Sequence, residues 1–326
     1  MSQNTSVTIK NNIDDKDMLT DTNDIFPQVG TVLTRNLIHD PTQRYYLYVP
    51  RGGGAVKSVF VTVHGVKRMA KEHALQFASF AERYGVVLVA PLFPKTYFRD
   101  YQRLGRNGRG RRADRALNRI LTEVGFLTGA NIDKLYMFGY SGGGQFVHRY
   151  AMAYPKRTAR IVVAAAGWYT FPDSAVNYPK GIKKVKGLKD IRFDPTQFLS
   201  VPACVVVGEK DIQRDLELNK SSKIDQLQGI NRLERGRAWV EAMVIAAKTY
   251  RLDTSYDFKV LPGCHHSFTK CMKRGKMGKW VFRFLFGSAR DSKKSPLSRK
   301  FSKSILTPSD QQKWEEEVQS TMKSLI

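Results

Sequence analysis

The most informative segment of the sequence is Lys134-Leu-Tyr-Met-Phe-Gly-Tyr-Ser-Gly-Gly-Gly-Gln-Phe-Val-His-Arg-Tyr150. Its first half contains an apolar run that is typical of a buried strand, and its second half has a helical pattern. Between the two halves, Gly139-Tyr-Ser-Gly-Gly143 matches the pattern G-x-S-x-G. A serine at a sharp turn between a strand and a helix indicates a nucleophile elbow.

The glycines of this segment have a physical explanation. A serine at the tip of so sharp a turn is held in a strained backbone conformation, and Gly139 and Gly143 have no Cβ that could clash with it. The hydroxyl of Ser141 would then lie at a helix N-terminus, where free N–H groups favour negative charge. The segment therefore predicts Ser141 as a nucleophile and the N–H of Gly142 as a donor to an oxyanion.

Strands and helices alternate on both sides of the elbow. The apolar runs that predict strands are residues 58–63, 86–90, 161–166, 203–207 and 256–261. The amphipathic patterns that predict helices are residues 71–84, 111–124 and 233–250. The last of these helices is expected to bury Trp239, Met243, Ala246 and Tyr250. Two more strands, at 31–38 and 44–49, are expected on either side of a turn at Asp40-Pro41. The predicted class is an α/β fold with a mostly parallel sheet and helices on both faces.

Length and composition set the domain organisation. The chain has 326 residues, of which 42% are hydrophobic, enough for one large core. We expect a polar, disordered leader over residues 1–30, a single domain over 31–287, and a basic tail over 288–326 that could hold a short helix. No apolar run reaches the roughly 18 residues of a membrane span, and no signal peptide is recognisable, so a cytoplasmic protein is expected. Three cysteines, an odd number without metal spacing, fit a reduced compartment.

The charge balance is strongly basic. Lys and Arg number 54 against 29 Asp and Glu, which gives a formal net charge of +25. Such a surface attracts anionic substrates and can bind nucleic acid non-specifically, without any dedicated site. It does not bear on the fold.

Polar residues follow several of the predicted strands. His64-Gly65, Ser141, Asp211 and His266 each come after the end of a different strand. In parallel sheets, ligands bind beyond the carboxyl ends of the strands. We therefore expect these residues to meet at one edge of the sheet.

A serine hydroxyl needs a base to take its proton and a carboxylate to orient that base. Asp211 is the predicted carboxylate, because it directly follows a strand; Asp215 and Glu209 are the alternatives. Of two adjacent histidines, His266 is the predicted base, since it stands immediately before Ser267-Phe268, where the last helix of the domain is expected to begin. His265 is the alternative.

Further residues are expected around this centre. The N–H of Val66, just after His64-Gly65, is the predicted second oxyanion donor. The residues expected to contact the substrate are His64, Tyr140, His265, Arg99 and Arg103. His73 and His148 are expected to be structural or exposed, and Cys264 to be a small buried side chain.

The arginines at 99 and 103 belong to a loop rich in arginine that begins at the carboxyl edge of the sheet. A charge run of this kind is often only a solvated face. The alternative is that its forked donors steer or clamp an anionic substrate.

The sequence resembles the α/β-hydrolase superfamily, in particular bacterial esterases related to polyhydroxybutyrate depolymerases and feruloyl esterases. The resemblance spans residues 44–286, and its carriers are His64-Gly65, Ala90-Pro91, Gly139-Tyr-Ser-Gly-Gly143, Gly208-Glu-Lys-Asp211 and Pro262-Gly-Cys-His-His-Ser-Phe268. It implies a serine esterase without metal or cofactor, and it assigns the base to His266. Cys264 and His265 depart from the family pattern, which has a small residue and glycine before the base.

These observations predict a serine hydrolase that cleaves a carboxylic ester, or a thioester or amide, through an acyl-enzyme. Its substrate would be a small-molecule or oligomeric ester, which could be anionic. The alternative is a non-catalytic binding protein on a hydrolase scaffold, whose basic surface binds anionic ligands or nucleic acid. The order Ser, Asp, His favours the enzyme, because a pure binder needs none of the three.

Overall fold

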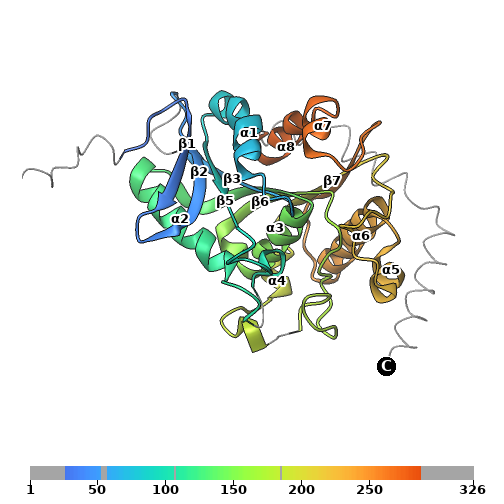
Figure 1. Cartoon of the computed structure of the whole chain (residues 1–326). Helices are drawn as coiled ribbons and strands as arrows, with labels where there is room; N and C mark the ends of the chain where they lie inside the picture. Colours follow the sequence, from blue (N-terminus) through green and yellow to red (C-terminus); the bar gives the residue numbers. More distant parts are fainter. Residues whose placement is uncertain (1–25, 53–56, 106–107, 184–185, 288–326) are drawn as a thin grey trace, which may run out of the picture.

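A computed structural model describes residues 26–52, 57–105, 108–183 and 186–287 (Figure 1). Most of the predicted leader and the whole predicted tail lie outside these residues. The centre of the described chain is an eight-stranded sheet in the order β1-β2-β4-β3-β5-β6-β7-β8. Its strands are β1 (Val32–Leu37), β2 (Asp40–Tyr48), β3 (Ser58–Val63), β4 (Val87–Pro91), β5 (Asn131–Tyr140), β6 (Thr158–Ala164), β7 (Ala203–Gly208) and β8 (Tyr256–Leu261).

The strands from β4 to β8 in this order are all parallel, and only β1 and β2 are antiparallel to their neighbours. The prediction of a mostly parallel sheet is therefore confirmed. The predicted turn at Asp40-Pro41 is wrong, because Leu37 pairs with Asp40 and the chain turns between them. Pro41 has no N–H to donate to a neighbouring strand. It is tolerated because it lies at a register shift of this hairpin, before β2 begins to pair with β4 at Tyr45.

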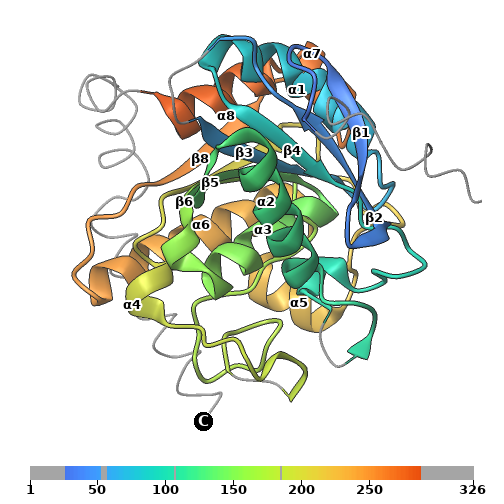
Figure 2. The ribbon, with the colours of Figure 1, turned by 90° about the vertical axis from the view of Figure 1, so that its left-hand side faces the viewer.

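Helices cover both faces of the sheet (Figures 1 and 2). One face carries α1 (Ala70–Tyr84), α7 (Phe268–Lys273) and α8 (Met277–Phe286). The other face carries α2 (Ala113–Thr128), α3 (Gly142–Ala153) and α6 (Arg232–Thr249). The connections contain η2 (Tyr101–Arg103), η4 (Pro155–Arg157), η5 (Lys186–Leu188), α4 (Pro195–Phe198) and α5 (Ser222–Gln228).

The two helical layers explain why the strands are continuous apolar runs. In β3, Val59 and Val61 pack into the core on the α2 and α3 side. Phe60 faces the opposite side, where its ring centroid lies 5.1 Å from that of Phe77 and 4.8 Å from that of Phe282. Burying a side chain of this size stabilises the fold by about 1.5–3 kcal/mol. A strand that is buried on both faces has no exposed side, so its sequence does not alternate between apolar and polar residues.

The long helix α6 differs from its prediction near its end. Trp239 and Met243 are buried as expected, but Ala246 is only partly buried and Tyr250 is 46% exposed. The helix ends at Thr249, so Tyr250 lies beyond the stripe that faces the sheet, and Ala247 is the buried residue of the last turn.

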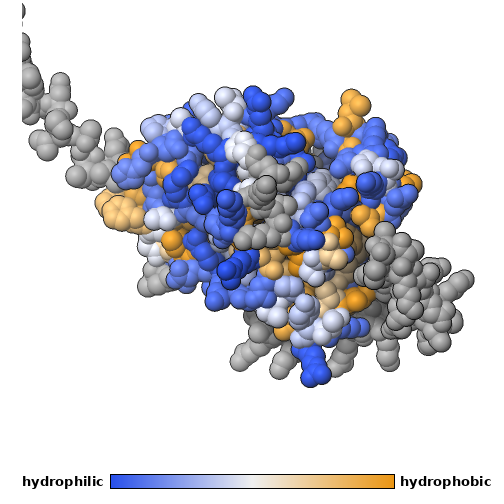
Figure 3. All heavy atoms as spheres, turned by 90° about the horizontal axis from the view of Figure 1, so that it is seen from below, coloured by the Kyte–Doolittle hydropathy of each residue, from blue (hydrophilic) through white to orange (hydrophobic). Residues whose placement is uncertain are grey.

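The surface of the described residues is mainly polar. On the face seen from below in Figure 3, hydrophilic residues cover most of the coloured area, with smaller hydrophobic groups among them. No helix within the described ranges has both the length and the apolar character that a bilayer crossing requires.

Candidate active site

Ser141 lies at the turn that joins β5 to α3. Its backbone has φ 54° and ψ −114°, a left-handed conformation that side chains other than glycine rarely adopt. The backbone N–H of Ser141 donates to the carbonyl of Ala164 on β6 at 2.7 Å, which anchors the turn to the neighbouring strand. Strain of this kind costs of order 1–3 kcal/mol and persists where the surroundings enforce it.

The glycines flanking the serine allow β5, β3 and α3 to come together. A Cβ at Gly139 would lie 2.2 Å from the carbonyl oxygen of Gly143. A Cβ at Gly143 would lie 2.0 Å from the carbonyl oxygen of Val63, at the end of β3. Both distances are far shorter than any van der Waals contact. Close packing thus excludes a side chain at both glycines, as predicted, but the crowding atoms belong to Gly143 and Val63 and not to Ser141.

The loops after β7 and β8 bring an acid and a histidine to the serine. The Nε2 atom of His266 lies 3.2 Å from the Oγ of Ser141. The Nδ1 atom of the same ring lies 2.7 Å from the Oδ2 of Asp211. A backbone hydrogen bond joins the two loops: the N–H of Lys210 donates to the carbonyl of Cys264 at 2.9 Å. The three predicted residues thus form one continuous line of contacts.

The alternative acids occupy other positions. The Glu209 carboxylate accepts a hydrogen bond from the backbone N–H of Gly263. The Asp215 carboxylate accepts from both terminal nitrogens of Arg232, at 2.7 and 2.9 Å. These hydrogen bonds hold the pKa of the Asp215 carboxyl below its usual value. Neither side chain has a hydrogen bond to His266 among the contacts of the described residues.

Arg232 was not anticipated from the sequence. Its side chain is fully buried, and it also reaches the Oδ1 of Asp211 at 3.3 Å. One guanidinium therefore holds both Asp211 and Asp215. No local pattern around Arg232 predicts this, because its partners lie 21 and 17 residues away on a different element.

The loop after β3 lies directly against the serine turn. A Cβ at Gly65 would lie 3.4 Å from the Cβ of Ser141, and one at Gly142 would lie 3.1 Å from the Cγ1 of Val66. Within the described part of the chain, the backbone N–H groups of Val66 and Gly142 have no acceptor. Two free donors beside the serine are what an oxyanion site requires.

His64 and Arg68 hold this loop in place. The Nε2 of His64 accepts from the N–H of Phe93 at 3.0 Å, and its Nδ1 lies 2.8 Å from the carbonyl oxygen of Gly65. Burial lowers the pKa of His64 to about 4, so the ring is neutral. Arg68 donates to the carbonyls of Phe93 and Val66. His64 was predicted to contact the substrate, but its side chain is buried and both ring nitrogens already have protein partners, which hold the loop in place.

The other aromatic residues predicted at the site lie around the His266 ring. Tyr140 is buried, and its ring packs against that of His266 with the centroids 5.3 Å apart. The side chain of His265 is exposed, while its carbonyl accepts from the N–H of Ser267. Cys264 is buried, as expected.

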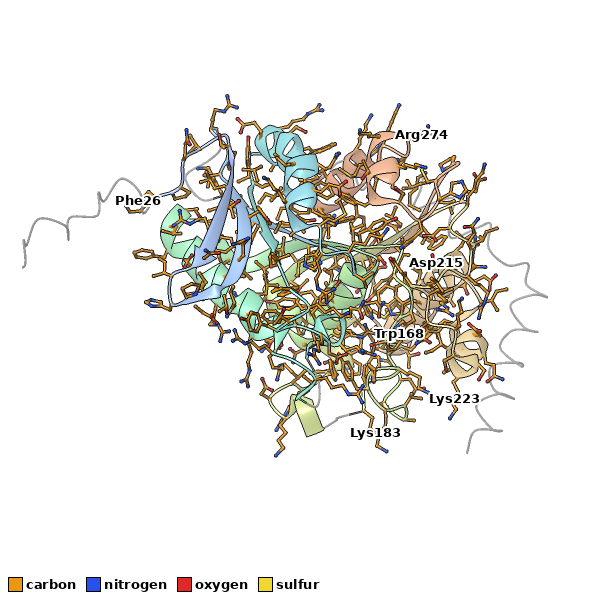
Figure 4. All side chains as sticks on the ribbon, in the orientation of Figure 1. Phe26, Trp168, Lys183, Asp215, Lys223 and Arg274 are labelled. Atoms are coloured by element: carbon orange, nitrogen blue, oxygen red, sulfur yellow. The ribbon has the colours of Figure 1, made fainter. Side chains whose placement is uncertain are left out.

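His73 and His148 are both buried rather than exposed. His73 stacks on Phe268, with ring centroids 3.8 Å apart. His148, in α3, accepts from the N–H of Thr170 at 3.0 Å, and its ring centroid lies 5.4 Å from that of Tyr169. The guanidinium of the neighbouring Arg149 stands 4.4 Å from the ring of Trp168, which is labelled in Figure 4.

Arg99 and Arg103 differ in their surroundings. Both line a hollow of about 510 Å³, and Arg99 also lines a second hollow of about 420 Å³ beside Val66. The guanidinium of Arg103 is paired with the buried carboxylate of Asp100. Arg99 is exposed, and it has no acidic partner within the described residues.

Comparisons with known proteins add to this geometry. No protein-family model and no curated protein matches the chain. A solved structure of poly(aspartic acid) hydrolase-1 from Sphingomonas sp. KT-1 is 22% identical, with a TM-score of 0.63, over 75% of this chain and 93% of that one. A poly(3-hydroxybutyrate) depolymerase from Bordetella parapertussis is 24% identical, with a TM-score of 0.63, over 80% of this chain and 93% of that one. The chain has the α/β-hydrolase fold.

The same fold is found in an S-formylglutathione hydrolase from Agrobacterium tumefaciens, which is 15% identical, with a TM-score of 0.52, over 78% of this chain and 94% of that one. The predicted α/β-hydrolase fold is therefore confirmed. In the α/β-hydrolase fold the nucleophile stands on the turn after a central strand, and the acid and the histidine follow it in the chain. Ser141, Asp211 and His266 occupy these places.

Proposed function

We propose that this protein is a serine hydrolase that cleaves carboxylic esters through an acyl-enzyme intermediate. The observation that carries the proposal is the line of contacts from Ser141 Oγ through the His266 ring to the Asp211 carboxylate, at 3.2 and 2.7 Å. Similarity of fold to a poly(aspartic acid) hydrolase and a poly(3-hydroxybutyrate) depolymerase supports hydrolytic chemistry. Thioesters and amides would react by the same route.

In the first half of the reaction, Asp211 accepts the Nδ1–H of His266, which leaves Nε2 free to take a proton. Ser141 Oγ attacks the carbonyl carbon of the ester as its proton passes to His266. The carbonyl oxygen becomes an oxyanion beside the N–H groups of Val66 and Gly142. Collapse of this intermediate breaks the ester C–O bond, and the leaving oxygen takes the proton from His266.

In the second half, a water molecule gives a proton to His266 and attacks the acyl carbon. The new tetrahedral intermediate collapses, breaks the bond to Ser141 and releases the carboxylic acid. The Ser141 oxygen takes the proton back from His266, so the enzyme returns to its starting state.

The test is replacement of the nucleophile. In Ser141→Ala, hydrolysis of 4-nitrophenyl butyrate should fall by about 10⁴-fold, and labelling by a fluorophosphonate probe should be lost. Ser255→Ala is a matched control, because this serine is exposed in the loop before β8. A wild-type protein that the probe does not label would contradict the proposal and favour a binding protein on this scaffold.

A further inference from the structure

A hollow of about 420 Å³ opens beside the loop that carries Val66. Its lining residues come from η2 and from the loops that follow β3 and β4. They are Val66, Arg68, Lys95, Arg99, Tyr101 and Gln102. Three of the six are cations and none is an acid. We call this the cationic hollow.

Three residues that line the cationic hollow lie against the serine turn. A Cβ placed on Gly142 would lie 2.6 Å from the hydroxyl of Tyr101 and 2.7 Å from the Nε2 of Gln102. Gly142 directly follows Ser141, and Val66 contacts the same position. A substrate held with its carbonyl between Val66 and Gly142 would therefore extend one of its ends past the cations.

The three cations lack acidic partners in the part of the chain that the structure describes. Arg68 donates only to backbone carbonyls, those of Phe93 and Val66. Lys95 and Arg99 are exposed, and neither forms an ion pair with a carboxylate of the described residues. Other arginines of this segment differ, because each is paired with Asp40, Asp100, Asp114 or Asp190; they are Arg103, Arg111, Arg112, Arg115 and Arg119.

Two charged side chains act on the Tyr101 hydroxyl in the wall of the hollow. Burial raises the pKa of Tyr101; the positive charge of Arg68 opposes this rise, and the negative charge of Glu217 adds to it. Glu217 is exposed and does not line the hollow, whereas Arg68 does.

We propose that the cationic hollow is a carboxylate-binding subsite, so that the enzyme prefers esters that carry a free carboxylate near the scissile bond. This inference rests on the proposed ester hydrolysis. Arg99 would supply forked donors that match a carboxylate, and Lys95 would add a mobile charge. Arg68 contributes its charge from a fixed position, while its donors hold the oxyanion loop.

The test compares acids with their own methyl esters. Mono-4-nitrophenyl adipate and its methyl ester place the carboxylate on the acyl side, and 4-acetoxybenzoate and its methyl ester place it on the leaving group. In Arg99→Ala/Lys95→Ala, kcat/KM for the acid of at least one pair should fall about tenfold or more, as expected for a lost charge-assisted contact. The corresponding methyl ester should change less than about twofold, which also shows that the variant is folded.

A matched control removes a cation elsewhere. Arg83 is exposed in the last turn of α1, which leads into the start of β4 at the opposite edge of the sheet. Arg83→Ala should leave both members of each pair unchanged. The preference for the acid should also fade between 0.1 and 1 M salt, as the Debye length drops from about 10 Å to about 3 Å.

The outcomes separate this inference from the proposed function. Equal losses for acid and methyl ester in both pairs would overturn the carboxylate subsite while leaving ester hydrolysis intact. If Arg83→Ala also loses the preference for the acid over its methyl ester, that preference is a general effect of net charge and the carboxylate subsite is overturned. If wild type hydrolyses none of the four esters and the fluorophosphonate probe does not label it, the proposed function itself fails.

Discussion

The two carboxylate oxygens of Asp211 have different partners. Oδ2 faces His266, and Oδ1 faces Arg232, which is fully buried and also holds Asp215. A buried cation is costly unless it is paired, and two acids share this one. Arg232 thus holds Asp211 in its orientation toward His266. Asp215 contacts Arg232 but not the histidine.

This difference gives a prediction for the two acids. Asp211→Asn should lower kcat by roughly 10³- to 10⁴-fold with the fold preserved, because the amide cannot stabilise the imidazolium and favours the wrong tautomer. Asp215→Asn should keep kcat within about tenfold of wild type, because Arg232 still contacts Asp211 and holds its orientation. Steady-state kinetics on 4-nitrophenyl butyrate, with circular dichroism as a check on folding, measures both. An inactive Asp215→Asn beside an active Asp211→Asn would move the acid to position 215.

A second residue-scale prediction concerns the adjacent histidines. His266→Ala should reduce kcat by about 10⁴-fold or more, because Ser141 loses its base. His265→Ala should have a small effect on kcat, as this side chain is exposed and only its backbone carbonyl is used. Single-turnover measurements of acylation distinguish the two. The assignment is refuted if His265→Ala is the inactive variant.

At the scale of elements, the active site depends on how closely β3, β5 and α3 approach one another. Three segments meet at the serine turn: the end of β3, the end of β5 and the first turn of α3. The backbone of Val63 and the glycines at 139 and 143 leave no room for a side chain between them. The strained conformation of Ser141 is enforced by this contact.

Gly143→Ala tests the approach directly. A methyl group 2.0 Å from the Val63 carbonyl oxygen must push α3 away from β3, and we expect a loss of about 1–3 kcal/mol or more in the free energy of unfolding, with lower activity. Gly52→Ala is the control, because a Cβ there meets nothing within 4 Å and no positive φ is required. Urea denaturation compares them. Equal stability of the two variants would show that the turn tolerates a wider separation.

At the scale of the whole molecule, three buried histidines link stability to pH. His64, His73 and His148 are each lined by backbone or hydroxyl partners that suit a neutral ring. Burial lowers the pKa of His64 to about 4 and those of the other two well below the usual value. In the unfolded chain, histidine has a pKa near 6.5. Below about pH 6.5 the unfolded state therefore binds more protons than the folded one.

The free energy of unfolding should consequently fall as the pH drops from about 6.5 to about 4. His64 alone accounts for about 2 kcal/mol of loss at pH 5. Urea denaturation at pH 7.5 and pH 5 measures the change. His148→Gln should flatten the dependence, while His39→Ala should not, because His39 is exposed. A free energy of unfolding that stays constant over this range would contradict the burial of neutral rings.

The sequence by itself determined the parts of this protein that depend on neighbouring residues. The elbow at Ser141, the apolar strands and the order of Ser141, Asp211 and His266 at strand ends all follow from local patterns, since strand and helix periods act over a few residues. The fold could be predicted for the same reason.

Only the tertiary structure decided which charges are paired and which side chains are buried. It joined Arg232 to Asp211, turned His64 inward against Phe93, and paired Arg103 with Asp100 while leaving Arg99 in the cationic hollow. Asp100 stands only three positions before Arg103, yet nothing local distinguishes that arginine from its neighbours. The energy of a charge depends on its distance from other charges and from water, and both distances are set by segments far apart in the chain.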